Sequence, residues 1–404
     1  MELQNAKEDI QSILSFFSGT FSRPSFKVFS SYVISFIQSG KEAHTSSLVQ
    51  SLTRPFLRRS LSSFTRFLGQ NIWAMEEIAE ISLSQFFDHL QIKAHSTLFL
   101  IVDDTLVQKT GKKIPGCAWH KDGACKPHVF GHQWVLFALL YRDFLLPLWA
   151  NLYHPKGTQG CGPFRTKILL VKRMLQVLRL PAPCKVYLLA DGWYWGKPLA
   201  QLCRTWGYHM ISQLRSNSVL FIDGKRAKVT TLSTLRSVYR EVSLPFYGKH
   251  RTLRIARFVG LIKNFGKVSV VVVKEKRKKP RYLVCTNLHL SASDILRYYA
   301  KRWKIEQMIK DLKQRLGFGD YQARNVQAIQ RHVALVLLSY CVLIFLKILH
   351  WLRDKTTSLN LSIRLLAFHV RKHILVEQIT VTIKTMKIQF KQNILDSYLE
   401  KLCV

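Results

Sequence analysis

Two aspartates stand directly after short apolar segments, where their carboxylates could hold metal ions. Asp103 follows the run 97–102, and Asp191 follows the run 185–190. Carboxylate oxygens are the ligands that Mg²⁺ and Mn²⁺ prefer, and two such ions held together can cleave and join phosphodiester bonds. A single aspartate at a strand end more often begins a turn. If the two segments are neighbouring strands, however, both carboxylates meet at one point.

Four polar residues near position 300 are spaced so that they would share one face of a helix. They are Tyr299, Arg302, Glu306 and Lys313, at steps of three, four and seven residues. On such a face Glu306 would reach the metal ions, while Arg302, Lys313 and the Tyr299 hydroxyl would reach phosphate oxygens beside them. The alternative is an exposed helix in which Arg302 and Glu306 form an ion pair one turn apart.

The segments between these residues predict an α/β catalytic domain within 93–216 and 291–352. Periodicity and apolar runs predict strands and helices in the order strand 97–102, strand 132–141, strand 144–149, helix 164–180, strand 185–190, helix 198–205 and strand 208–213. Three strands, helix, strand, helix, strand is the order of the ribonuclease H-like fold, a mixed sheet flanked by helices. We therefore expect the strands that carry Asp103 and Asp191 to lie side by side.

The rest of the chain predicts additions to this core. Residues 217–290 are β-rich and include a basic turn at 274–279, which indicates an inserted sheet. A long helix is expected from Ser291, capped by Asp294, to about Gly317, and an apolar helix over 326–352.

The two ends of the chain differ in character from the core. Residues 1–92 predict a helical domain, either a packed basic one or one that binds a specific DNA end, with Arg54, Arg58, Arg59 and Arg66 among its cations. The segment 353–404 is basic, and its sequence suggests no role.

The charge of the chain indicates a polyanionic partner. The 404 residues include 61 Lys and Arg against 24 Asp and Glu, a net charge of +37. So large an excess opposes compact folding, and each phosphate that a cation neutralises releases counterions. A soluble basic protein or a structural nucleic-acid binder is the alternative.

Nothing in the sequence predicts secretion or membrane insertion. Eight scattered cysteines indicate reduced thiols, and the first ten residues, with Glu2, Glu8 and Asp9 among them, do not predict a signal peptide. The apolar run 333–346 is shorter than the roughly 20 residues that a bilayer span needs. We expect a cytoplasmic, nucleoid-associated protein with no membrane contact.

The pattern Tyr299-x2-Arg302-x3-Glu306-x6-Lys313 resembles the Y-R-E-K signature of bacterial insertion-sequence transposases of the cut-and-paste DDE type. Trp303 completes a block similar to the R-W-x-I-E of that family. Asp103 with Thr105 two residues later, and Asp191 after an apolar run, are similar to its first two acids. The resemblance covers roughly 95–350 and includes the β-rich insertion.

This resemblance implies a site, a cofactor and partners. Asp103, Asp191 and Glu306 would be the catalytic residues and would hold two Mg²⁺ or Mn²⁺ ions. Tyr299, Arg302 and Lys313 would bind DNA phosphates. The expected partners are double-stranded DNA with terminal inverted repeats, target DNA and a second copy of the chain on that DNA.

Several alternatives stay open at this stage. Asp104 could replace Asp103 as the first acid, because adjacent strand residues point to opposite sides. The chain could be a non-catalytic DNA-binding protein derived from a transposase, or a metal-dependent nuclease that cuts without joining. A zinc site is a further option, built from the cluster Cys117, His120, Cys125, His128 and His132.

Overall fold

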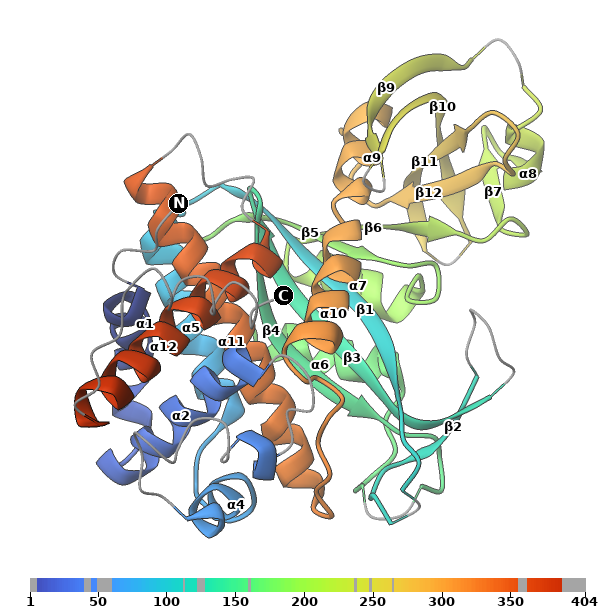
Figure 1. Ribbon diagram of the computed structural model, residues 1–404. Helices are drawn as coiled ribbons and strands as arrows, with labels where there is room; N and C mark the ends of the chain where they lie inside the picture. Colours follow the sequence, from blue (N-terminus) through green and yellow to red (C-terminus); the bar gives the residue numbers. More distant parts are fainter. Residues whose placement is uncertain are drawn as a thin grey trace.

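The structure is a computed structural model that describes residues 6–39, 45–48, 60–111, 113–121, 128–158, 161–235, 238–246, 249–263, 265–354 and 362–386. A helical body covers one side of a twisted sheet, and a β-rich lobe extends from the opposite edge (Figure 1). Three of the predicted N-terminal cations, Arg54, Arg58 and Arg59, lie outside the described residues.

The central sheet is mixed and flanked by helices, as expected for a ribonuclease H-like domain. Its strands are β1 (Thr97–Gln108), β3 (Val129–Tyr141), β4 (Phe144–Tyr153), β5 (Lys185–Ala190) and β6 (His209–Leu214). The spatial order is β4-β3-β1-β5-β6, with β1, β5 and β6 parallel and β3 antiparallel to both of its neighbours. Helices α6 (Lys167–Val177) and α7 (Lys197–Thr205) form the crossovers, and β2 (Ala118–His120) extends the far edge of β3. The predicted order of elements is confirmed.

Strand β1 runs further than its apolar run predicts. It pairs with β3 as far as Gln108, so Asp103 lies within the strand, opposite Leu136, and not at its end. The long antiparallel partner supplies hydrogen bonds beyond the apolar run, which keeps the polar residues of β1 extended. The parallel partner β5 ends earlier, and its Leu189 lies opposite Ile101, so Asp191 follows close to the level of Asp103.

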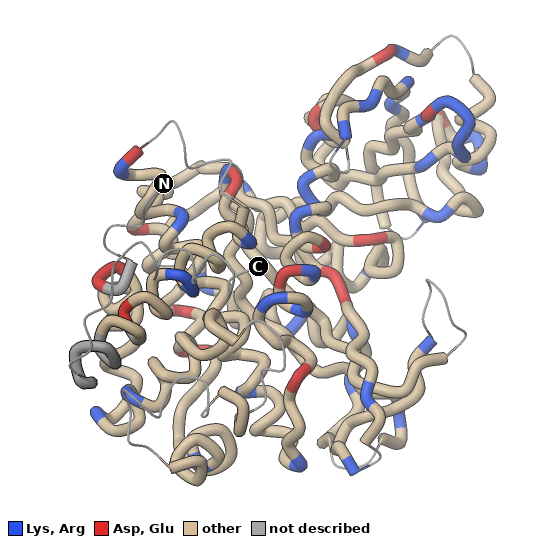
Figure 2. Tube along the Cα trace, viewed as in Figure 1, with Lys and Arg blue, Asp and Glu red and all other residues tan. Residues whose placement is uncertain are grey.

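The residues between β6 and the second half of the core form a β-rich insertion. It contains β7 (Val219–Ile222), β8 (Lys225–Lys228), α8 (Val229–Leu232), β9 (Arg240–Phe246), β10 (Lys249–Ile262), β11 (Gly266–Lys274) and β12 (Arg281–Cys285). Because β12 pairs with β6, these strands continue the core sheet. Lysines and arginines line much of this lobe, including the turn between β11 and β12 (Figure 2).

The prediction of a single helix from Ser291 to Gly317 is wrong, because the segment forms two helices. They are α9 (Ala292–Ala300) and α10 (Trp303–Arg315). The expected cap at the start is present, since Ser291 Oγ accepts from the amide of Asp294 at 3.1 Å. The break has a backbone cause. The amides of Lys301 and Arg302 donate to carbonyls three residues back, which tightens the chain into a turn between the helices.

The apolar helix α11 (Val326–Arg353) lies at the centre of the helical body. It packs on β4 and on α1 (Ala6–Ser15), α2 (Arg23–Ser39), α4 (Leu61–Gly69), α5 (Met75–Leu90) and α12 (Ile363–Met386). In the described part of the chain it is the one helix long and apolar enough to cross a membrane, but 83% of its most apolar window is buried within the fold. It is therefore the core helix that the sequence predicted.

The N-terminal helices share their core with this helix. Buried Arg331 of α11 donates to the carbonyls of Leu68 and Trp73, both at 3.1 Å. Arg353 at the other end of α11 pairs with Asp9 of α1 at 2.7 Å. The role of residues 1–92 in binding a DNA end stays a prediction.

Candidate active site

Arg302 joins two of the three predicted carboxylates. It lies at the junction of α9 and α10 and is 8% exposed. Its Nη1 donates to Asp103 Oδ2 at 2.7 Å, and its Nη2 donates to Glu306 Oε1 one turn further along. The i,i+4 ion pair considered from the sequence therefore exists. It is part of a larger cluster that ties α10 to the middle of β1.

Asp191 occupies a fixed turn directly after β5. Its Oδ1 accepts from the amides of Trp193 at 2.9 Å and Tyr194 at 3.4 Å, and its carbonyl accepts from Ser212 Oγ at 2.7 Å. Gly192 is required here, because a Cβ atom at this position would lie 2.9 Å from the carbonyl oxygen of Gln213 on β6. The neighbouring strands thus hold the Asp191 carboxylate in one place.

The pKa of Asp103 is raised by burial and by the charges of two other aspartates. Burial, the largest cause, raises its pKa to about 6, and the charges of Asp191 and Asp104 act in the same direction. The Arg302 guanidinium and the backbone amide of Asp104 oppose that rise. A positive charge close to Asp103 would favour the ionised form of its carboxyl group.

Asp104 points to the other face of the sheet and is engaged there. Its Oδ2 accepts from Lys167 Nζ of α6 at 2.6 Å and from the Gln133 amide, and its Oδ1 accepts from the Tyr194 hydroxyl at 3.2 Å. The alternation of side chains along a strand explains the separation. Of the two adjacent aspartates, the structure brings Asp103 to Arg302 and Glu306, and it ties Asp104 to α6.

The two remaining residues of the predicted stripe lie on either side of Arg302. Lys313 is exposed and donates from Nζ to the carbonyl of Leu106 on β1 at 2.6 Å. Tyr299 is only 2% exposed, and the Arg302 guanidinium lies 6.0 Å from its ring centre. The turn between α9 and α10 breaks the continuous stripe, so Tyr299 lies in the core behind Arg302 while Lys313 reaches the surface.

The donor set suits a hard divalent cation. Asp103, Asp191 and Glu306 offer only carboxylate oxygens, and the mutual repulsion at Asp103 is of the kind that a cation relieves. Among the described residues, no three His, Cys, Asp or Glu side chains lie close enough together to form a metal site. The Arg302 guanidinium pairs with both Asp103 and Glu306. The chemistry of the residues fits Mg²⁺ or Mn²⁺, with Arg302 as the present counter-charge.

The cysteine and histidine cluster does not form a zinc site among the described residues. Both ring nitrogens of His132 are occupied: Nε2 donates to the Pro115 carbonyl at 2.9 Å, and Nδ1 accepts from the Tyr321 hydroxyl at 2.7 Å. Cys125 lies outside the described residues.

Sequence reasoning missed the residues that support the site. Tyr194 joins Asp104 to the Asp191 turn, and its position three residues after Asp191 is a signal that could have been used. Lys167 carried no signal, since only the fold brings the start of α6 to β1.

The mixed sheet flanked by helices defines an α/β protein in which Arg302 joins a carboxylate of β1 to one of α10. The transposase DDE domain family matches residues 94–342, from the residues before β1 to the middle of α11. The chain belongs to this family of transposase domains. No curated protein sequence matches the chain.

Proposed function

We propose that the chain is a cut-and-paste transposase of the insertion-sequence type, which cleaves and joins DNA strands at Asp103, Asp191 and Glu306. The observation that carries the proposal is the Arg302 guanidinium shared by Asp103 and Glu306. It brings an acid of β1 and an acid of α10 to one point, and the Asp191 carboxylate adds its field there. Membership of the transposase DDE domain family supports the same reaction class.

The three carboxylates would hold two Mg²⁺ or Mn²⁺ ions. Bound ions would supply an activated water or 3′-hydroxyl and would stabilise the charge that develops on the phosphate. The Asp191 turn orients its carboxylate through two backbone amides, and β1 and α10 fix the other two. Strand β1 and the turn after β5 belong to the sheet, which keeps Asp103 and Asp191 in place, whereas the Arg302 guanidinium would have to move for Asp103 and Glu306 to bind the same ions.

The cationic residues of the signature would position the DNA. Arg302 has a planar guanidinium suited to two parallel hydrogen bonds with phosphate oxygens, and it lies at the carboxylates themselves. Lys313 is exposed beside the end of β1 and would contact a phosphate further along the strand. Tyr299 stays our candidate for a third phosphate contact; its buried ring behind Arg302 requires the hydroxyl to act from within the site.

The proposed substrates are double-stranded DNA with terminal inverted repeats and a target DNA. The net charge of +37 supports a polyanionic partner. Two DNA ends require two active sites, so we propose a homodimer on DNA, acting in the cytoplasm at the nucleoid. The rival functions are a non-catalytic DNA-binding protein of transposase origin and a nuclease that cuts without joining.

The test is metal-dependent cleavage of a labelled duplex that carries the terminal repeat of the element. We expect nicking at the repeat boundary with Mg²⁺ or Mn²⁺, followed by strand transfer to a target duplex. Asp191→Ala should abolish both steps, while Glu241→Ala, an exposed acid on β9, should retain them. Specific binding without cleavage would favour the non-catalytic rival, and cleavage without strand transfer would favour the nuclease.

A further inference from the structure

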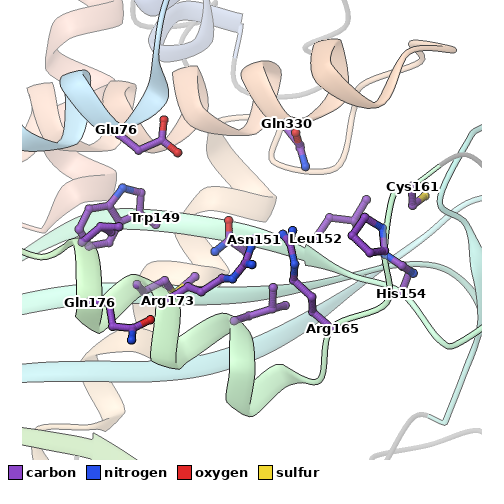
Figure 3. Close-up of a pocket in the computed structure, with 14 residues that line it drawn as sticks. Glu76, Trp149, Asn151, Leu152, His154, Cys161, Arg165, Arg173, Gln176 and Gln330 are labelled. Carbon is purple, nitrogen blue, oxygen red and sulfur yellow. The ribbon is translucent and has the colours of Figure 1, made fainter. Parts of the chain in front are cut away.

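A polar pocket of about 420 Å³ lies beside the edge strand β4, apart from the carboxylate cluster. Its walls come from β4, α6, the loop before α6, the start of α5 and α11. The residues that carry its chemistry are Glu76, Trp149, Asn151, Arg165, Arg173 and Gln330 (Figure 3). Its volume falls within the 300–1,000 Å³ range of small-ligand sites. Nothing in the proposed catalytic site uses these residues.

Two arginines supply the positive charge of this pocket. Arg165 precedes α6 and Arg173 lies on it, and both side chains extend toward Asn151 in the middle of the pocket (Figure 3). Neither guanidinium has an ion-pair or hydrogen-bond partner within the described part of the chain. Convergent arginines without a carboxylate partner are suited to bind a phosphate group bidentately.

Side chains that could form hydrogen bonds with a nucleobase lie around the two arginines. The amides of Asn151 on β4 and Gln330 on α11 each offer a donor and an acceptor, as the edge of a base requires. The Trp149 indole nitrogen is buried and has no hydrogen-bond partner in the described structure. A buried N–H donor without an acceptor is uncommon and costs stability.

The pocket lies on the face of the sheet that carries Asp104, opposite to the face on which Asp103 meets Arg302. Asn151 lies opposite Val135 of β3, which in turn lies opposite Asp104 of β1, so all three side chains face the same side of the sheet. Two strand spacings separate Asn151 from Asp104, which is about 10 Å. Helix α6 contributes to the pocket and to the Asp104 contact, since it begins at Lys167, the partner of Asp104, and carries Arg173 about 1.7 turns later.

We propose that this pocket binds a single nucleotide unit with one phosphate. Arg165 and Arg173 take the phosphate oxygens, and the amides of Asn151 and Gln330 contact the sugar and the base. Glu76 lines the same pocket, and its charge disfavours a chain of further phosphates. The nucleotide can come from an unpaired position of a DNA strand or from free nucleotide. The first source rests on the proposed function, because it requires DNA at the neighbouring site.

The test is direct binding of deoxyadenosine 5′-monophosphate, measured by calorimetry without metal ions on the full chain carrying Asp191→Ala. In the proposed function this variant does not cleave DNA, so binding is read separately from catalysis. We expect binding at least tenfold tighter than that of inorganic phosphate, deoxyadenosine or deoxyadenosine triphosphate. Arg165→Gln and Arg173→Gln should each weaken it about tenfold or more, as loss of a charge-assisted hydrogen bond predicts. Lys172→Gln removes a neighbouring charge of α6 that does not line the pocket, and should change affinity less than twofold.

Competition identifies the source of the nucleotide. A duplex with one unpaired nucleotide that displaces the monophosphate, while a blunt duplex does not, indicates a DNA strand. Failure of both duplexes to compete indicates free nucleotide. Inorganic phosphate that binds as tightly as the nucleotide, an equal loss in Lys172→Gln, or no nucleotide binding at millimolar concentration would overturn the proposal. None of these results depends on whether the chain cleaves DNA.

Discussion

Arg302 Nη1 lies 2.7 Å from Asp103 Oδ2, although 199 residues separate the two in sequence. The contact closes α10 onto the middle of β1, across the whole β-rich insertion. The same guanidinium also holds Glu306, so one cation balances acids from both halves of the core. Removal of either acid would therefore leave Arg302 with a partner, whereas removal of Arg302 would leave two carboxylates facing each other.

Asp104→Asn should destabilise the protein, by about 3 kcal/mol, because it removes the counter-charge of the mostly buried Lys167 ammonium. The two side chains are only 18% and 11% exposed. Asp143→Asn is the matched control, since it breaks an exposed pair with Lys304 and should cost about 1 kcal/mol or less. Urea denaturation measures both. Equal losses in the two variants would contradict the structural role of Asp104.

His132 should make the protein acid-sensitive. Burial is the main cause that lowers its pKa from 6.5 to about 4, and its Nδ1 must stay unprotonated to accept from Tyr321. The unfolded chain binds this proton first, so the stabilisation is complete above pH 6.5 and is lost as the pH falls toward 4. The expected loss from this group is about 3 kcal/mol.

Glutamine at position 132 cannot be protonated in this pH range. Comparison of His132→Gln with the original protein therefore isolates the loss of stability that is due to His132. Thermal or urea unfolding of both proteins between pH 7 and 4 should give curves that converge at low pH, because the variant lacks the dependence due to His132. Parallel curves over this range would show that His132 is not buried in its neutral form.

The order of elements was predictable from the sequence, and the exact ends of several were not. Local periodicity reports whether a segment is a strand or a helix, which is why β5 was predicted with its observed bounds. The extension of β1 to Gln108 depends on its pairing with β3, and the break between α9 and α10 depends on the turn at Lys301. Such features arise from tertiary contacts that a single sequence does not display.

The candidate site divides in the same way. The spacing of Arg302 and Glu306 predicted their shared helical turn, and the break before Arg302 leaves that spacing intact. Thr105 favoured Asp103 over Asp104 as the first acid, but the different contacts of the two adjacent aspartates could not be predicted, because they depend on which face of β1 meets α6. Lys167 and Tyr194 were missed for the same reason: their contacts with Asp104 join elements that are 63 and 90 residues apart.

Gly131→Ala should disrupt the pairing of β1 and β3. A Cβ atom at this position would lie 2.0 Å from the carbonyl oxygen of Val107, a backbone atom that cannot move aside without breaking the strand pair. We expect a loss of about 3 kcal/mol or more, at the upper end of the cost of overpacking.

Gly69→Ala is the matched control for that change. This glycine ends α4, and an added Cβ would meet nothing within 4 Å. It should be neutral or slightly stabilising, because alanine restricts the unfolded chain. Thermal unfolding compares the two variants. A small effect of Gly131→Ala would mean that the end of β1 is not paired as described.

Lys313→Gln should weaken DNA binding and make it less dependent on salt. Lys313 is exposed where α10 approaches β1, and in the proposed function it contacts one phosphate. Each contact of this kind adds roughly 0.9 to the slope of the logarithm of affinity against the logarithm of salt concentration. The variant should therefore lose about one unit of that slope while retaining the preference for the terminal repeat.

Lys185→Gln is the control variant. It removes an exposed lysine at the start of β5, about 20 Å along the strand from Asp191, and should leave the slope unchanged. Fluorescence anisotropy between 50 and 200 mM salt, roughly the range over which such contacts are resolved, measures both variants. An unchanged slope for Lys313→Gln, or an equal decrease for Lys185→Gln, would place the DNA away from the α10 face and would contradict the assignment of Lys313.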